Sequence, residues 1–174
     1  MKPPAKTQER LHKLKERSSR RGLKFWLSAW LPVAVCIGVI MIESTEQFGS
    51  NHTSGPLRWL WEALFGPVVN FRWERIHHLI RKSGHFIGYG AVGAAWLRAW
   101  WMTLPHSRFI EDAFLALMGT SLVASLDELH QSYLPNRTGS PWDVMLDCCG
   151  AIALQILIYT YLRLMRPKKL ARAE

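Results

Sequence analysis

Long apolar runs alternate with shorter polar segments along this chain of 174 residues. The first run, residues 25–42, is uncharged and 18 residues long, about the minimum for a helix that crosses the hydrocarbon core of a membrane. Further apolar runs cover residues 83–104, 109–126 and 142–165. We therefore predict an all-α fold, a polytopic membrane helical bundle with about four transmembrane helices.

A fifth apolar stretch, residues 57–71, is aromatic but short and interrupted. Its interruptions are Arg58, Glu62, Gly66 and Pro67. We expect an interfacial or re-entrant segment here rather than another crossing. Residues 72–82 then form an amphipathic lead-in to the second span. That span is rich in small residues, which let membrane helices approach closely. Its glycines are Gly84, Gly88, Gly90 and Gly93.

Positive charge is concentrated at the two ends of the chain. Residues 2–24 hold nine Lys or Arg against two acids, and the segment from Arg163 onward holds five against one. The positive-inside rule explains such tails better than nucleic-acid binding, so we predict no nucleic-acid partner. Residues 1–24 and 166–174 are expected to be basic cytoplasmic tails.

Three polar clusters lie at the ends of predicted spans, where ionisable groups are costly and are usually kept for function or for pairing. Starts of even spans and ends of odd spans lie on the same face of a membrane. With both tails in the cytoplasm, all three clusters therefore converge at the outer interface. The members that we predict to bind a ligand are Lys82, His85, Tyr89, Asp127, Glu128, Gln131, Arg137, Asp143 and Asp147.

Helical spacing refines this cluster. Lys82, His85 and Tyr89 form one stripe, and Asp143 and Asp147 lie one turn apart. Asp143 also follows a Ser-Pro-Trp sequence that is typical of a capping box, so it can cap the fourth span. The outer cluster contains both cationic and anionic side chains, which can pair with one another. We expect Arg137, in a short turn beside several acids, to form an ion pair.

Some of the same residues are also of metal-ligand type. Candidate ligands are His85, Asp127, Glu128, His130 and Asp147, and histidine–carboxylate sets suit zinc or manganese. No compact metal-binding motif is present, and Lys82 and Arg137 would repel a cation. We therefore predict no metal and no cofactor.

The same residues carry a resemblance to the VanZ-like family of small bacterial membrane proteins. The matching blocks are Arg81-Lys82-x-x-His85-Phe86-x-x-Tyr89, Asp127-Glu128-x-x-Gln131-x-x-x-Pro135-x-Arg137 and Asp143-Val144-x-x-x-x-x-Gly150. The resemblance implies a membrane domain over residues 25–165, located in the bacterial cytoplasmic membrane. This chain departs from the family pattern at Asp147, often an asparagine, and at Gly88, often an acid.

The family is linked to teicoplanin resistance, so the resemblance implies a role in the cell envelope. We expect the protein to bind or modulate a membrane lipid or lipid-linked cell-wall precursor at the outer polar site. One alternative is an intramembrane hydrolase or transferase acting on a lipid-linked substrate, with His85, Glu128 or Asp127 as the catalytic candidates. Another is a structural staple, in which the cluster only closes the bundle and function lies in contacts with partners. The oligomeric state stays open.

Overall fold

The computed structural model describes residues 22–104, 107–135, 137 and 139–165, and all of its regular structure is helical. The elements are α2 (Leu23–Glu43), the short 3₁₀ helix η1 (Glu46–Phe48), α3 (Ser50–Phe65), α4 (Asn70–Thr103), α5 (Phe109–Ser132) and α6 (Pro141–Met165). The predicted all-α helical fold is confirmed. The two predicted basic tails lie almost entirely outside the described residues.

Three of these helices are long and apolar enough to cross a membrane: α2, α5 and α6. Two of them begin and end within two residues of the predicted spans, whereas α5 continues six residues beyond the predicted end at residue 126. The Asp-Glu-Leu-His-Gln segment is therefore helical. The predicted second span, residues 83–104, belongs to α4 and is not among the three, so this crossing stays a prediction.

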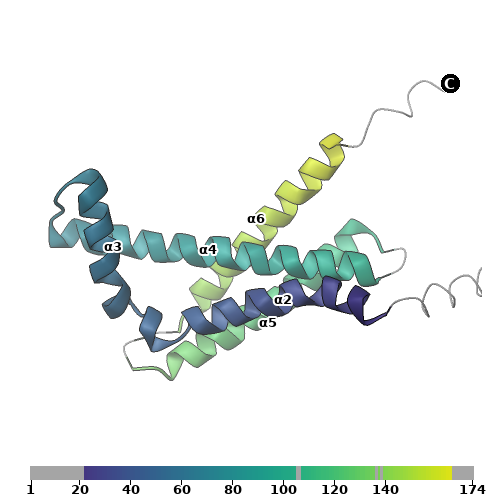
Figure 1. Cartoon of the computed structure of the whole chain (residues 1–174), viewed down its shortest axis with the longest axis horizontal. Coiled ribbons are helices and arrows are strands. Elements are labelled where there is room, and N and C mark those ends of the chain that lie inside the picture. The colour runs from purple at the N-terminus through teal and green to yellow at the C-terminus, as the bar shows by residue number, and fades with distance from the viewer. Residues whose placement is uncertain (1–21, 105–106, 136, 138, 166–174) are drawn as a thin grey trace, which may run out of the picture.

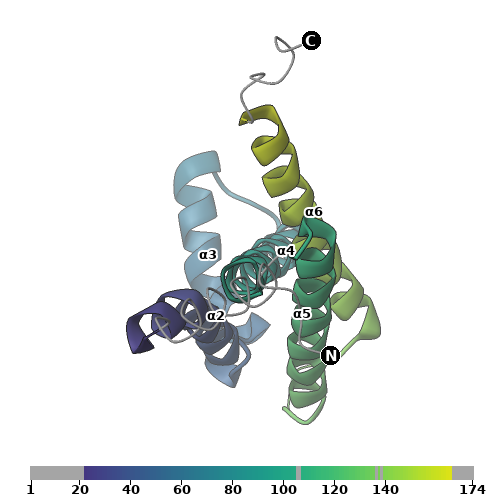
Figure 2. The ribbon, with the colours of Figure 1, turned by 90° about the vertical axis from the view of Figure 1, so that its right-hand side faces the viewer.

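Helix α4 is the centre of the bundle and contacts α2, α3, α5 and α6. Viewed nearly end-on, it lies between the other long helices (Figure 2). Many of its buried positions are small or apolar, among them Gly90, Val92, Gly93 and Ala99. Because neighbouring helices cover so much of α4, its sequence does not need the continuous apolar surface that α2, α5 and α6 present.

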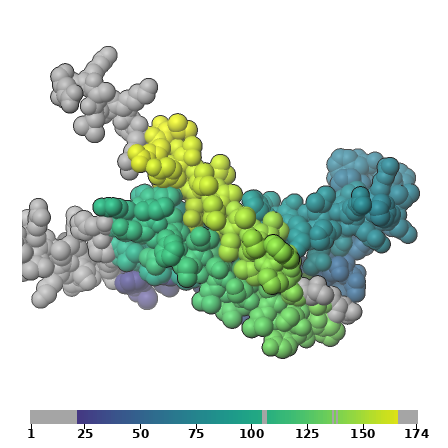
Figure 3. All heavy atoms as spheres, turned by 180° about the vertical axis from the view of Figure 1, so that it is seen from behind, coloured from purple at the N-terminus to yellow at the C-terminus, as the bar shows by residue number. Residues whose placement is uncertain are grey.

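The closest helix contact is the crossing of α4 and α6. A Cβ atom added at Gly93 would lie 2.7 Å from the Cβ of Ala151, and one added at Gly150 would collide with the carbonyl oxygen of Phe86. The view from behind shows α6 lying across α4 and α5 (Figure 3). The expectation of close approach through small residues thus holds at Gly90 and Gly93. It is wrong at Gly84, where an added Cβ atom would meet no atom of another element within 4 Å.

Helix α3 crosses the N-terminal part of α4 instead of running beside the bundle (Figure 1). It ends at Gly66, whose φ of 87° favours glycine, and Pro67 follows. Three hydrogen bonds fix it to α4. Trp73 Nε1 donates to Ser54 Oγ at 2.7 Å, Thr53 Oγ1 lies 3.1 Å from His77 Nε2, and Arg58 Nη1 donates to Asn70 Oδ1 at 2.8 Å. The predicted interruption at residues 66–67 is therefore present, but the helix before it begins earlier than expected.

Candidate functional site

The polar stripe on α4 meets acids from two other helices. Lys82 forms an ion pair with Asp143 at the start of α6. One turn deeper, His85 Nδ1 lies 3.6 Å from Asp147 Oδ1. Crossing counts and helical spacing predicted that these residues converge, and the structure brings them together.

The deepest pair of the stripe is Tyr89 with Asp127. Tyr89 is fully buried, and its hydroxyl donates to Asp127 Oδ2 at 3.0 Å. The same oxygen accepts a second hydrogen bond from Gln131 Nε2 at 3.1 Å. The bond from Tyr89 joins α4 to α5, and the bond from Gln131 stiffens α5. Asp127 is therefore engaged in packing contacts in this structure.

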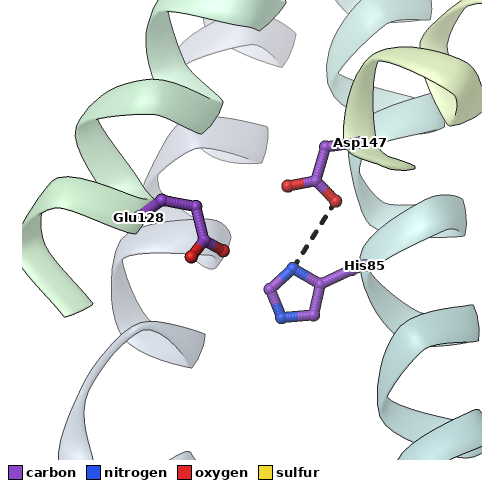
Figure 4. A group of neighbouring side chains, drawn as sticks. All are labelled: His85, Glu128 and Asp147. Carbon is purple, nitrogen blue, oxygen red and sulfur yellow. Dashed lines mark ion pairs between the residues drawn. The ribbon is translucent and has the colours of Figure 1, made fainter. Parts of the chain in front are cut away.

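Glu128 has a different environment from its neighbour. Its Oε2 accepts a hydrogen bond of 2.8 Å from the backbone N–H of Ser140, while its Oε1 is buried without a hydrogen-bond partner among the described residues. Asp147 is completely buried, and neither of its carboxylate oxygens has a hydrogen-bond partner among the described residues. These carboxylates and His85 face one another (Figure 4).

The predicted capping box at the start of α6 is only half formed. Ser140 Oγ accepts a hydrogen bond of 3.3 Å from the Trp142 N–H, as a helix cap should. The reciprocal bond from the Ser140 N–H goes to Glu128 of α5 instead of Asp143. Asp143 is thereby available to pair with Lys82, which is a contact between helices that local sequence could not reveal.

The prediction of an ion pair for Arg137 is wrong, because this residue forms none among the described residues. Its Nη2 donates to the carbonyl oxygens of Glu43 at 3.0 Å and Thr45 at 2.9 Å. These carbonyls lie at the C-terminal end of α2, where a cation is favoured by the helix dipole. Arg137 thus ties the α5–α6 turn to α2.

A polar cavity of about 360 Å³ opens above these pairs. Its lining is Ser50, His78, Arg81, Lys82, His85, Gln131, Arg137, Ser140 and Asp143. Five of the predicted ligand-binding residues line it, while Tyr89, Asp127, Glu128 and Asp147 do not. Sequence reasoning missed Ser50, His78 and Arg81 as site residues, and it assigned Ser140 only to the start of the fourth span.

The missed α4 members had a detectable signal. His78 and Arg81 precede Lys82 and His85 at helical spacing, so the stripe extends one turn further toward the N-terminus than we predicted. Ser50 had none, because its position depends on α3 folding back across α4. His130, a candidate metal ligand, lies elsewhere: its Nδ1 is 3.1 Å from Ser44 Oγ on the α2 side.

Fold and site define an integral membrane protein of helical-bundle class with a polar cluster between its helices. The chain matches the VanZ/LLP1 family over residues 29–164 and belongs to that family. The comparisons with curated proteins and with solved structures gave no significant match. The predicted resemblance is therefore confirmed, and the matched range includes the whole polar cluster.

Proposed function

We propose that this VanZ-family protein binds a phosphate-bearing lipid or lipid-linked cell-wall precursor of the bacterial envelope in the polar cavity. The observation that carries this proposal is Arg81. It lines the cavity and forms no hydrogen bond or ion pair with any described residue. Its neighbour Lys82 is neutralised by Asp143, so Arg81 is the guanidinium left to pair with an incoming anion.

A second guanidinium strengthens the positive potential of the cavity. Burial lowers the pKa of Arg137, and the nearby charge of Arg81 lowers it further, although Asp127 and Glu128 act in the opposite direction. Two guanidinium groups that disfavour one another's charge are stabilised by an anion between them. Phosphate matches guanidinium geometry especially well, because it can accept paired hydrogen bonds.

The cavity's size and place support a head group as the ligand. A volume of about 360 Å³ is near the lower end for small-molecule sites, so it suits a phosphorylated head group with its chains left in the surrounding lipid. The cavity lies where α2 ends and α6 begins, opposite the helix ends that continue into the basic tails. The positive-inside rule predicts that both tails are cytoplasmic, and on this predicted orientation the proposed binding site faces the outer interface of the cytoplasmic membrane.

Removing the Arg81 charge tests the proposal. We expect Arg81→Gln to weaken binding of phosphatidylglycerol in nanodiscs by about tenfold, as loss of one charge-assisted hydrogen bond would do. Native mass spectrometry with phosphatidylcholine as the neutral competitor measures the change. Inorganic phosphate in a parallel titration tells whether the head group alone suffices. Arg137 is a poorer choice, because its truncation would also release the end of α2.

Arg72→Gln is the matched control, since Arg72 is an exposed residue of α4 that does not line the cavity. It should bind the anionic lipid like the unmodified protein. Equal weakening in both variants would mean that only the general surface charge attracts the lipid. Unchanged binding in Arg81→Gln would reject the cavity as the site.

Hydrolysis of such a lipid is a second candidate, favoured by the free Oε1 of Glu128 beside His85. The hydroxyl groups nearby give no activated nucleophile: Ser132 Oγ donates to the Leu129 carbonyl, and Ser140 Oγ accepts the Trp142 N–H. Water is then the nucleophile, with Glu128 as general base. Phosphate release from a lipid phosphate should be abolished in Glu128→Gln; an undiminished rate in that variant would exclude this role.

A further inference from the structure

Three side chains of metal-ligand type meet at one point of the bundle. His85 comes from α4, Glu128 from α5 and Asp147 from α6. One nitrogen or oxygen of each lies within 4.8 Å of the corresponding atoms of the other two. Figure 4 shows the two carboxylates and the imidazole directed toward a common space. No two of them are close in sequence, so their convergence results from the fold.

The polar atoms at this point lack hydrogen-bond partners among the described residues, although His85 and Asp147 are within ion-pair distance. Asp147 has no exposed surface, and neither of its oxygens is hydrogen-bonded among the described residues. The same holds for Glu128 Oε1 and His85 Nδ1. The 3.6 Å between His85 Nδ1 and Asp147 Oδ1 is longer than a hydrogen bond. A buried carboxylate without hydrogen-bond partners is strongly unfavourable, and either a proton on the carboxyl group or a cation among the three side chains relieves it.

Within the part of the chain that the structure describes, no lysine or arginine forms an ion pair with Glu128 or Asp147. Lys82 is paired with Asp143, and Arg137 donates to the carbonyls at the end of α2. Asp143 neutralises Lys82, so the repulsion of a metal ion expected from Lys82 is reduced, whereas that from Arg137 remains. A protonated His85 offsets the charge of one carboxylate and leaves the second to take up a proton, whereas a single divalent cation offsets both.

We propose that His85, Glu128 and Asp147 together bind one divalent transition-metal ion, with zinc as the first choice and manganese as the second. An imidazole with two carboxylates is a ligand set typical of these metals, while magnesium and calcium prefer oxygen ligands alone. The Ser140 N–H holds the second oxygen of Glu128, as an outer partner of a metal ligand does. Three protein ligands leave a coordination position open. The site goes beyond the proposed lipid binding and does not depend on it.

The direct test is metal stoichiometry. The full chain, expressed without a polyhistidine tag and stripped with EDTA, is titrated with zinc chloride and analysed by calorimetry and elemental analysis. We expect one zinc ion per chain in the unmodified protein. Affinity should fall by about tenfold or more in His85→Ala, Glu128→Gln and Asp147→Asn. A manganese titration then ranks the two metals.

Asp112→Asn is the matched control, because Asp112 is an equally buried aspartate on α5 that is paired with Ser107, far along the helix from Glu128. It should bind one zinc ion like the unmodified chain. Failure of the unmodified protein to bind zinc or manganese, or full binding by all three site variants, would overturn the proposal.

Spectroscopy on the unmodified protein covers the case in which a variant does not fold. Besides His85, the chain has six histidines and three cysteines that could capture zinc elsewhere. X-ray absorption at the zinc edge should show one imidazole, oxygen ligands and no sulfur. Two or more imidazoles, or any sulfur, would place the metal at another site. Lipid binding measured in EDTA separates this outcome from failure of the proposed function.

Discussion

Adding a single methyl group at Gly150 is expected to lower the midpoint of thermal unfolding by roughly 3–10 °C, which corresponds to an overpacking cost on the order of 1–3 kcal/mol. The new Cβ would collide with the Phe86 carbonyl, and backbone atoms cannot rotate away as a side chain can. The helices α4 and α6 would have to separate, and they carry the polar pairs of the site. Thermal unfolding of Gly150→Ala in detergent, followed by circular dichroism, measures the loss.

Gly84→Ala is the control for this experiment. It adds the same methyl group on α4 at a position with nothing within 4 Å. Alanine is the better helix former, so this variant should be as stable as the unmodified protein or slightly more stable. If Gly150→Ala unfolds at the same temperature as Gly84→Ala, the close crossing of α4 and α6 is wrong.

The second large effect is expected from Asp127→Ala. This change leaves the fully buried Tyr89 hydroxyl and the buried Gln131 amide without their acceptor. An unpaired buried polar group costs about 1–3 kcal/mol, although hydrogen bonds between membrane helices often contribute less. We expect a loss of about 2–3 kcal/mol in the free energy of unfolding, measured by denaturant titration in mixed micelles.

Tyr89→Phe provides the internal control. Alone it should cost about 1 kcal/mol, since it removes one hydrogen bond but leaves Gln131 paired with Asp127. In the double variant the two losses should not add, because phenylalanine removes the unpaired hydroxyl that Asp127→Ala creates. Strictly additive losses would show that Tyr89 and Asp127 do not interact.

Much of the architecture was accessible from sequence because apolar runs respond directly to the membrane. Runs of about 20 residues located α2, α5 and α6, and the parity of crossings brought the stripe of α4 to the acids of the other helices. The 34-residue length of α4 was not foreseen, since the amphipathic lead-in and the span differ in composition but share one helix. Because α4 lies at the centre of the bundle and neighbouring helices cover it, its sequence is less apolar than that of α2, α5 and α6.

The site was predicted as a set of residues but not as a set of partners. Which cation meets which acid depends on helix rotation and tilt, and these are decided by contacts distant in sequence. Arg137 illustrates this, because its turn lies near acids, yet its guanidinium reaches the carbonyls that end α2. The Ser140 N–H likewise binds Glu128 in place of the local Asp143. The buried point shared by His85, Glu128 and Asp147 became visible only when three helices were placed together.

The spacing of the stripe residues gives the distance along the axis of α4 over which the polar pairs extend. An α-helix rises about 1.5 Å per residue, so Lys82 and Tyr89, seven positions apart, are separated by about 10 Å along the axis. The paired residues therefore form a descending series: an ion pair at the cavity, a histidine with its aspartate below it, and a buried phenol with its carboxylate at the bottom. Such a series is a row of polar groups inside the bundle, about one third as long as a hydrocarbon core of about 30 Å is thick. A head group held at Arg81 would have charged or hydrogen-bonding groups beneath it for that whole distance.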